Sequence, residues 1–231
     1  MIGIIGAMQA EVENLIGAIV GLKKERFGGF EFAVGKIGHH EVVAARCGVG
    51  KVNAAVCTQT MLLRYQPEVV INSGVAGSLS PELGILDIAV AVDAVQHDYD
   101  TTGLGEPAGA LSIGGGLVTA LPCDPVWRER LLNAAKSMGM RAVPVRIASG
   151  DQFITQREIK ERIVKTFGAS ACEMEGGAVG QVCTAGGVPF AVVRAMSDSA
   201  DGGAVEDYPS FAKKAAEISA KIVIRAVTLI W

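Results

Sequence analysis

The chain has 231 residues, half of them hydrophobic, which suits one domain with a substantial core, residues 1–231. Its 21 basic and 24 acidic residues give a net charge of −3 without a basic stripe, so we expect no nucleic-acid partner. The five cysteines form no CxxC pair, and the three histidines add no metal-binding spacing. We therefore expect free thiols and no bound metal.

Neither end of the chain reads as a targeting or membrane segment. The start, MIGIIGAMQAEVENL, has no basic region and reaches Glu11 too early for a signal peptide. The last apolar run is interrupted by Lys221 and Arg225, which makes it too short and too charged to span a bilayer. Together with the free thiols, these features predict a cytoplasmic protein with no membrane partner.

Hydrophobic periodicity, broken by glycine and proline, predicts strands that alternate with helices. In chain order we expect a strand at 2–5, a helix at 8–20, paired strands at 30–37 and 41–47, a helix at 51–65, and strands at 68–77 and 87–95. A glycine-rich loop at 99–116 precedes a helix at 124–139, a strand from 143, helices at 157–167 and from 176, a strand at 188–198 and a final helix at 208–230.

This alternation, with nearly continuous apolar strands, predicts an α/β sandwich around a largely buried sheet. Ligands of such sheets bind at the carboxyl ends of the strands. Polar residues cluster at those ends here, in GAMQAEVE, INSGVAGS, SGDQFI, CEME and RAMSD. The long loop at 99–116 has a length that is common among functional lids.

Acidic residues stand out among these candidates. Glu11 lies one turn into the first helix, where a solvated glutamate that suits the helix dipole is the plain alternative. Glu173 and Glu175 flank Met174 in a run of small apolar residues, although buried carboxylates are costly unless they are paired or used. They share one face if the stretch is extended, and fan into a cleft if Glu175 begins a helix. Acids gathered by a helix N-terminus are the competing interpretation.

Two further candidates follow apolar strands. Arg194 and Asp198 close the strand VPFAVVRAMSD, and an arginine there needs an acidic partner, for which Glu175 and Glu11 are the natural choices. A purely structural ion pair is the competing interpretation. Phe153 and Ile154, in SGDQFI, either belong to the core or offer an aromatic face and free backbone groups to a planar ring.

The remaining motifs exclude several chemistries. CGVGKV is not a phosphate-binding loop, and no dinucleotide fingerprint, nucleophile elbow or Ser/His/Asp set is present. Several acids, one arginine and an aromatic residue, without a metal, suit cleavage of a glycosidic bond. One acid protonates the leaving group and another activates water.

Taken together, GAMQAEVE, CGVGKVNAA, INSGVAGS, SGDQFI, CEMEGGAVG and RAMSDSAD resemble the nucleoside phosphorylase/nucleosidase superfamily. Within it, the chain is most similar to the 5′-methylthioadenosine/S-adenosylhomocysteine nucleosidases. The resemblance runs from Ile2 to the final helix. It implies a three-layer α/β/α sandwich around a mixed, twisted sheet, a small-molecule nucleoside substrate and no cofactor.

The resemblance also implies roles for the charged residues. Glu11 would activate the attacking water, and Asp198 would deliver a proton to N7 of adenine. Glu175 would hold the ribose hydroxyls, while Arg194 would neutralise and position the acids and help to order the water. Glu173 would support these residues from behind the site.

Further implied roles concern the walls of the pocket. Phe153 would stack on adenine, the backbone of Ile154 would contact the edge of the base, and Met174 would pack on sugar and base. Ser197 would orient Asp198. The residues implied to line the ribose and alkylthio region are Met8, Val49 and Tyr208. A homodimer is implied too, in which the partner's loop near Leu104 closes the alkylthio pocket.

Two departures from the family pattern bear on the substrate. Val75 stands where a small hydroxyl residue is usual, which removes a hydrogen-bond donor near the water and ribose. The loop GLGEPAGALSIGGG does not match the family pattern. Hydrolysis is favoured over phosphorolysis, because Glu11 repels phosphate and the first loop has no Lys or Arg. Futalosine and 5′-deoxyadenosine remain possible substrates, and a non-catalytic ligand sensor is the competing class of protein.

Overall fold

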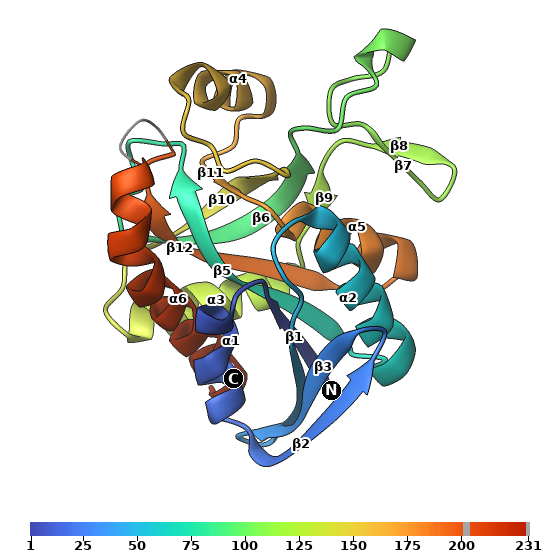
Figure 1. The fold of residues 1–231 in the computed structure, drawn as a ribbon, viewed down its shortest axis with the longest axis vertical. Coiled ribbons are helices and arrows are strands. Elements are labelled where there is room, and N and C mark those ends of the chain that lie inside the picture. The colour runs from blue at the N-terminus through green and yellow to red at the C-terminus, as the bar shows by residue number, and fades with distance from the viewer. Residues whose placement is uncertain (201–203, 230–231) are drawn as a thin grey trace.

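The structure, a computed structural model, describes residues 1–200 and 204–229. Helices cover both faces of a central sheet (Figure 1). One face carries α1 (Gln9–Gly17), α3 (Pro125–Ser137) and α6 (Ala204–Thr228). The other carries α2 (Lys51–Tyr65) and α5 (Gly176–Gly186), and α4 (Arg157–Phe167) lies at one end. The predicted three-layer α/β/α sandwich is confirmed.

The sheet is mixed and has ten strands within the described residues. They are β1 (Ile2–Gly6), β2 (Val20–Phe27), β3 (Phe30–Ile37), β4 (His40–Arg46), β5 (Val69–Ser78), β6 (Ile88–Gln96), β9 (Leu121–Pro122), β10 (Ala142–Ser149), β11 (Ala171–Glu173) and β12 (Phe190–Asp198). Their spatial order is β11-β10-β6-β12-β5-β1-β4-β3-β2, and β9 pairs with β6. β1 and β12 are buried along their whole length, as expected for central strands that read as continuous apolar runs.

The short strand β11 closes part of the sheet into a ring. β6 runs antiparallel to β12 and pairs with it only through Ile88–Val90, whereas it pairs with β10 from Ile88 to Gln96. β11 lies parallel to β10, and it also pairs antiparallel with the end of β5, where Ala171 faces Ser78. The carboxyl ends of β5, β10, β11 and β12 therefore meet, although these strands do not all run in one direction.

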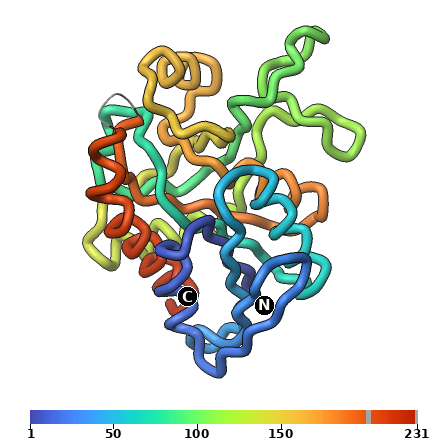
Figure 2. Tube along the Cα trace, in the orientation of Figure 1, coloured from blue at the N-terminus to red at the C-terminus, as the bar shows by residue number. Residues whose placement is uncertain are grey.

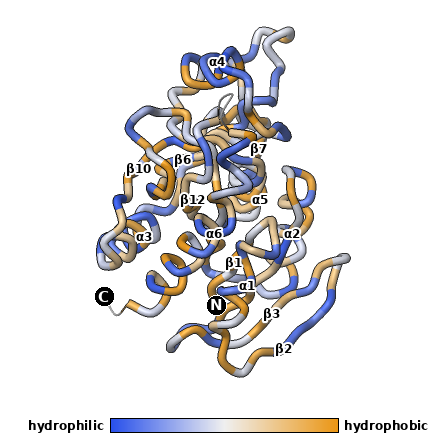
Figure 3. The backbone as a smooth tube through the Cα atoms, turned by 60° about the vertical axis from the view of Figure 1, so that its left-hand side comes forward, coloured by the Kyte–Doolittle hydropathy of each residue, from blue (hydrophilic) through white to orange (hydrophobic). Residues whose placement is uncertain are grey.

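Apolar side chains fill the space on each side of the sheet. Met61 of α2 and Val179 of α5 belong to the core on one side, and Leu15 of α1 and Val223 of α6 belong to the core on the other. Hydrophobic segments accordingly gather in the central strands, and hydrophilic ones in α4 and β2 (Figure 3). All five cysteines are buried and unpaired. In the described part of the chain, no helix combines the length and apolarity needed to cross a membrane.

Two predicted helix ends are wrong, and one strand was not predicted. The first helix ends at Gly17 rather than residue 20, and Val20–Phe27 forms β2, for which the sequence analysis predicted no element. β2 is an exposed edge strand that pairs with β3. Its charged residues give no apolar pattern from which the strand could be predicted. The final helix begins at Ala204 rather than Tyr208, because Pro209, which often marks a helix start, lies inside it.

The segment expected to be a glycine-rich loop has structure of its own. It contains a short 3₁₀ helix, η1 (Thr102–Leu104), and the hairpin of β7 (Leu111–Ile113) with β8 (Gly116–Val118). Gly114 and Gly115 both have positive φ, which is the geometry of a tight hairpin turn. We call residues 99–118 the excursion, because they leave the body of the molecule (Figure 2).

Candidate active site

A pocket opens where the carboxyl ends of the strands meet. It is lined by Ala7, Met8, Glu11, Val49, Val75, Ala76, Gly77, Gln152, Phe153, Ile154, Cys172, Glu173, Met174, Glu175, Ser197, Asp198 and Tyr208. The structure thus brings together all the site residues predicted from the sequence except Arg194 and Leu104. Four of the lining residues are carboxylates, and none of those described is Lys, Arg or His.

Glu11 is buried, with only 3% of its surface exposed, so the interpretation as a solvated first-turn glutamate is wrong. Its Oε2 accepts hydrogen bonds from the backbone N–H groups of Ala7, at 2.7 Å, and Met8, at 2.9 Å. Its Oε1 accepts one from the N–H of Val75 at 3.0 Å. A Cβ at Gly74 would lie 2.4 Å from Oε1, so the strand needs glycine there to admit the carboxylate.

Glu173 and Glu175 have different surroundings. Glu173 ends β11, and its carboxylate accepts from the N–H of Glu175 at 3.0 Å, the N–H of Gly176 at 2.8 Å and the Ser149 hydroxyl, and pairs with Arg194. Glu175 is the N-cap of α5. Its Oε1 accepts from the N–H of Gly50 at 2.8 Å, and its Oε2 lies 3.9 Å from Arg194 Nη2. Glu175 therefore has fewer bonds within the protein than Glu173.

Arg194 lies behind the pocket and is only 1% exposed. Its guanidinium donates to the Asn72 carbonyl at 3.1 Å, to the Asn72 side chain and to Glu173. The prediction that Glu175 and Glu11 are its natural partners is corrected. Glu173 is the direct partner, because the closure of the sheet by β11 brings its carboxylate to the guanidinium.

Burial and charge separate the pKa values of these acids. Burial raises the pKa of Glu11, although Arg194 and three backbone N–H groups oppose the rise. Burial and then the charge of Glu173 raise the pKa of Glu175 to about 8. Burial also acts to raise the pKa of Glu173, but Arg194, the Ser149 hydroxyl and backbone N–H groups bring it below its ordinary value. Perturbed carboxyls of this kind, collected in a cleft, are typical of catalytic sites.

Asp198 ends β12 at the pocket. Its Oδ2 accepts from the Ser197 hydroxyl at 2.9 Å, and its Oδ1 accepts from the Ala200 N–H at 2.9 Å. A Cβ at Gly77 would lie 2.7 Å from Oδ1, so this glycine also makes room for a carboxylate. The Ser197 hydroxyl and the Ala200 N–H therefore each hold one oxygen of the Asp198 carboxylate.

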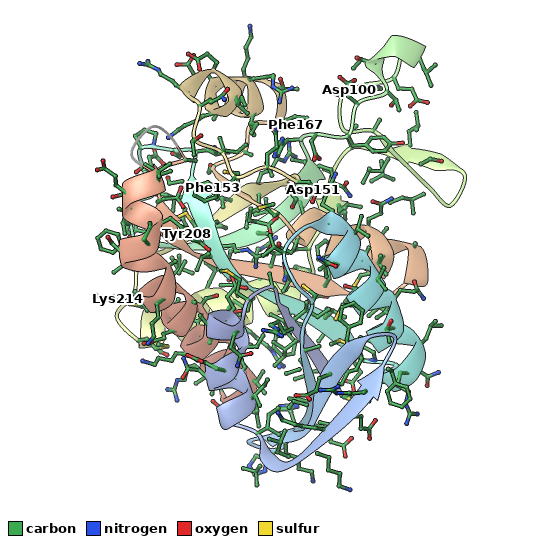
Figure 4. All side chains as sticks on the ribbon, viewed as in Figure 1. Asp100, Asp151, Phe153, Phe167, Tyr208 and Lys214 are labelled. Atoms are coloured by element: carbon green, nitrogen blue, oxygen red, sulfur yellow. The ribbon has the colours of Figure 1, made fainter. Side chains whose placement is uncertain are left out.

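The apolar side of the pocket carries two aromatic rings. Phe153 and Tyr208 lie together in Figure 4, with ring centroids 5.2 Å apart and an interplanar angle of 73°. Phe153 is 48% exposed, so its ring is open to a ligand rather than part of the core. The Tyr208 hydroxyl donates to Met8 Sδ at 3.2 Å, while Ile154 is buried. These side chains form a surface suited to a planar base and an apolar substituent.

Leu104 and Val75 differ from the other predicted site residues in what they contribute to the pocket. Leu104 lies in η1 on the excursion, is 81% exposed and does not line the pocket of its own chain. Val75 does line the pocket. Its backbone N–H donates to Glu11, and this bond does not depend on the side chain at position 75. The loss of a hydroxyl at this position therefore leaves that hydrogen bond in place.

Several groups that support the charged residues could not be predicted from the sequence. The amide of Asn72 and the hydroxyl of Ser149 hold Arg194 and Glu173, and the N–H of Gly50 holds Glu175. All three lie in the glycine-containing motifs INSG, ASGD and CGVG. Those motifs indicated the correct strand ends, but small polar residues there carry no separate signal for their role.

We expect Arg194→Met to destabilise the protein by about 3–5 kcal/mol, because it leaves Glu173 as a buried charge without its partner. Urea unfolding measures this. The matched control is Arg141→Met, which removes the more exposed pair with Asp87 and should cost about 0–1 kcal/mol. A loss below about 1 kcal/mol for Arg194→Met would contradict the ion-pair argument, as would a similar loss in both variants.

Comparison with known proteins identifies the family to which this chain belongs. The family model described as the phosphorylase superfamily matches residues 1–228, and the chain belongs to that superfamily. A relative from Treponema pallidum (strain Nichols), called 5′-methylthioadenosine/S-adenosylhomocysteine nucleosidase, is 37% identical over 250 residues, with 98% of this chain and 92% of the relative covered. The resemblance inferred from the motifs is confirmed.

Solved structures agree in fold over nearly the whole chain. A 5′-methylthioadenosine/S-adenosylhomocysteine nucleosidase from Neisseria meningitidis, in complex with methylthio-immucillin-A, has a TM-score of 0.94 and 34% identity, with 98% of both chains covered. A futalosine hydrolase mutant of Helicobacter pylori strain 26695 has a TM-score of 0.92 and 35% identity, with 98% of this chain and 97% of that chain covered. Both relatives share the fold of this chain from end to end.

Proposed function

We propose that this protein is a hydrolase that cleaves the N-glycosidic bond of 5′-methylthioadenosine and S-adenosylhomocysteine and releases adenine. Residues 1–231 form one nucleosidase domain in this proposal. The observation that carries it is the set of lining residues, in which Glu11, Glu175 and Asp198 share one pocket with the open ring of Phe153. The unpaired thiols and mild charge support a cytoplasmic enzyme. The mechanism uses side chains alone, without a cofactor.

The reaction needs one proton donor and one proton acceptor. Adenine stacks on Phe153, the backbone of Ile154 contacts its edge, and Glu175 binds the ribose hydroxyls beside Met174. The glycosidic electron pair leaves with adenine as the protonated Asp198 gives its proton to N7. Water adds to the anomeric carbon while Glu11 takes one of its protons. Exchange with solvent returns the proton from Glu11 to Asp198, so adenine and the free alkylthioribose are the products.

The charge of the pocket favours water over phosphate as the attacking group. A phosphate site needs cationic side chains or free backbone donors. The N–H groups of Ala7, Met8 and Val75 are already bonded to Glu11, and the described lining includes no cationic side chain. The raised pKa of Glu11 makes it a stronger base than an ordinary glutamate. These features support hydrolysis.

Incubation of the purified protein with 5′-methylthioadenosine, with and without phosphate, tests the proposal. We expect adenine and free methylthioribose at the same rate in both samples. A sugar 1-phosphate that forms only with phosphate would make the protein a phosphorylase and remove the role given to Glu11. Absence of adenine under all conditions would favour a non-catalytic ligand sensor.

A second candidate reaction is the hydrolysis of futalosine, because the futalosine hydrolase structure matches this chain at 35% identity. Another candidate substrate is 5′-deoxyadenosine, which lacks the alkylthio group. Parallel assays with S-adenosylhomocysteine, futalosine and 5′-deoxyadenosine rank these substrates by kcat/KM. We expect the two alkylthio nucleosides to rank first, because Met8, Tyr208 and Phe153 give the pocket an apolar wall.

The proposed assembly is a homodimer in which Leu104 of the partner subunit closes the alkylthio pocket. Two exposed apolar surfaces support it. Val52, Val56 and Leu63 form a stripe along one face of α2, and Leu104 and Leu117 are exposed on the excursion. A groove of about 960 Å³ beside the pocket shares Ala7, Met8 and Val49 with it, so a partner segment there would reach the substrate.

We expect Val56→Asp to convert the protein from dimer to monomer and to lower activity, because the charge lies within the apolar stripe and each pocket then loses the partner's loop. Light scattering during gel filtration gives the mass, and the adenine assay gives the activity. Val126→Asp, an exposed valine in the first turn of α3, is the control and should change neither. A wild-type protein that is monomeric and active would overturn the proposed assembly.

A further inference from the structure

A closed polar cluster lies beside the pocket, centred on Lys51, the first residue of α2. Lys51 Nζ donates to Asp98 Oδ1 at 2.6 Å and to Gln96 Oε1 at 3.1 Å. The backbone N–H of Lys51 donates to Asp151 Oδ1 at 2.7 Å, and the N–H of Asp151 donates to Asp98 Oδ2 at 2.8 Å. Lys51, Asp98 and Asp151 thus form a ring of three bonded residues, which we call the Lys51 cluster.

The Lys51 cluster holds three parts of the site. Gly50, which precedes Lys51, donates its N–H to Glu175 Oε1. Asp151 lies two residues before Phe153, on the same loop (Figure 4). Asp98 follows β6 and begins the chain's path into the excursion. One ammonium group therefore ties together the start of α2, the loop that carries the aromatic ring and the base of the excursion.

The turn before α2 lies close to the loop that carries Asp151. Gly50 has φ of +98°, and a Cβ there would lie 3.0 Å from Asp151 Oδ1, so the turn before α2 accommodates the carboxylate only as glycine. Lys51 and Asp98 side chains are 17% and 22% exposed, which makes this pair stronger than an ordinary surface pair. None of the three cluster residues lines the pocket. Their effect on a ligand must pass through Gly50, Glu175 and Phe153.

Gln96 extends the Lys51 cluster to α5. Its side-chain amide accepts from Lys51 Nζ and donates to Gln181 Oε1 at 2.7 Å, and Gln181 belongs to the helix that Glu175 caps. The two ends of the Gly50–Glu175 hydrogen bond are therefore linked a second time through Lys51. A displaced Lys51 would loosen both links at once.

We propose that Lys51 is a positioning residue, which acts through Asp98, Asp151 and Gln96 to hold the Gly50 N–H against the ribose-binding carboxylate of Glu175 and to set the loop of Phe153. The inference rests on the proposed nucleosidase function. It assigns a role to Lys51 of CGVGKV, which the catalytic scheme leaves unused.

The ionisation of Glu175 gives the inference a distinctive readout. Glu175 faces Glu173 of β11, Arg194 of β12 and Glu11 of α1, besides the Gly50 N–H. The N–H stabilises the charged carboxylate, and its loss raises the pKa of Glu175 further. Glu175 accepts from both ribose hydroxyls only when ionised. The acidic limb of the kcat/KM profile should therefore move to higher pH when Lys51 is removed.

The test compares wild type, Lys51→Met, Lys51→Arg and the control Arg146→Met in the methylthioadenosine assay. Arg146 pairs with Asp93 between β10 and β6, away from the pocket lining, and these side chains are 36% and 17% exposed. For Lys51→Met we expect KM to rise about tenfold, the effect of one lost hydrogen bond to a charged group, with a smaller change in kcat. The acidic limb of its kcat/KM profile should shift to higher pH. We expect Lys51→Arg to recover part of the change in KM and part of the pH shift. Arg146→Met should show neither change.

Unchanged KM and an unchanged acidic limb in Lys51→Met would overturn the inference, as would equal shifts in Arg146→Met. If Lys51→Met does not fold, as judged by circular dichroism, Asp98→Asn removes the other half of the pair and must show the same two shifts. Failure of the proposed function is recognised separately, because the wild type then releases no adenine. In that case the Kd for adenosine tests the positioning role of Lys51. Equal Kd values for wild type and Lys51→Met would overturn that role.

Discussion

Replacing Asp198 by asparagine should lower kcat for 5′-methylthioadenosine by a factor of about 10²–10⁴ and leave KM nearly unchanged. The asparagine amide can still donate a hydrogen bond to N7 of adenine, so binding of the base persists. It cannot transfer a proton, so adenine must leave as an anion. The shape of the site is kept, because the side-chain oxygen can still accept from the Ala200 N–H while the Ser197 hydroxyl rotates to accept from the amide nitrogen.

Single-turnover measurements of adenine release separate chemistry from binding in this variant. The matched control is Asp124→Asn, at the N-cap of α3, where asparagine caps as well as aspartate and activity should be unchanged. An Asp198→Asn protein with near wild-type kcat would show that another group protonates the base. A large rise in KM with constant kcat would instead make Asp198 a binding residue.

Glu11→Gln should lower kcat by a similar factor of about 10²–10⁴, because the neutral amide cannot take a proton from water. Geometry adds to this loss. In the wild type, both carboxylate oxygens of Glu11 accept from backbone N–H groups, at Ala7, Met8 and Val75. The amide nitrogen of glutamine must face either the N–H groups of Ala7 and Met8 or the N–H of Val75. At least one buried N–H group is then left without an acceptor. The water position next to the side chain is then disturbed as well.

Glu13→Gln, on an exposed position of the same helix, is the control for Glu11→Gln and should retain full activity. Unfolding in urea shows whether any loss of turnover follows from loss of fold. Substantial activity in a folded Glu11→Gln protein would exclude Glu11 as the base. The pH profile provides a further check, since turnover of the wild type should fall as pH drops through the raised pKa of Glu11.

The central part of the fold follows directly from local sequence. β5 and β12 read as long apolar runs that end in glycine or polar residues, and these ends form the pocket. Glu11 could be placed at the same edge of the sheet, because α1 begins directly after the end of β1. Periodicity and strand ends therefore predicted where the pocket lies and which acids line it.

Pairing between distant side chains could not be predicted in the same way. Arg194 pairs with Glu173 rather than Glu175 or Glu11, because β11 bridges β10 and β5 and fixes where its last carboxylate lies. That bridge involves few residues and leaves little trace in hydropathy. β2 escaped prediction for a related reason, since an exposed edge strand rich in charged residues has no buried face to reveal it.

The ring closed by β11 has a consequence for folding kinetics. β5 pairs along its length with β12, from Val70 beside Phe190 onward, so the site depends on contacts between residues far apart in the chain. Contacts between residues far apart in the chain slow folding, because the loop-closure entropy is lost before the contacts form. Until β12 is in place, the carboxylate of Glu173 has no guanidinium beside it. Recovery of enzymatic turnover during refolding should therefore report completion of the whole structure, not the appearance of any single half of it.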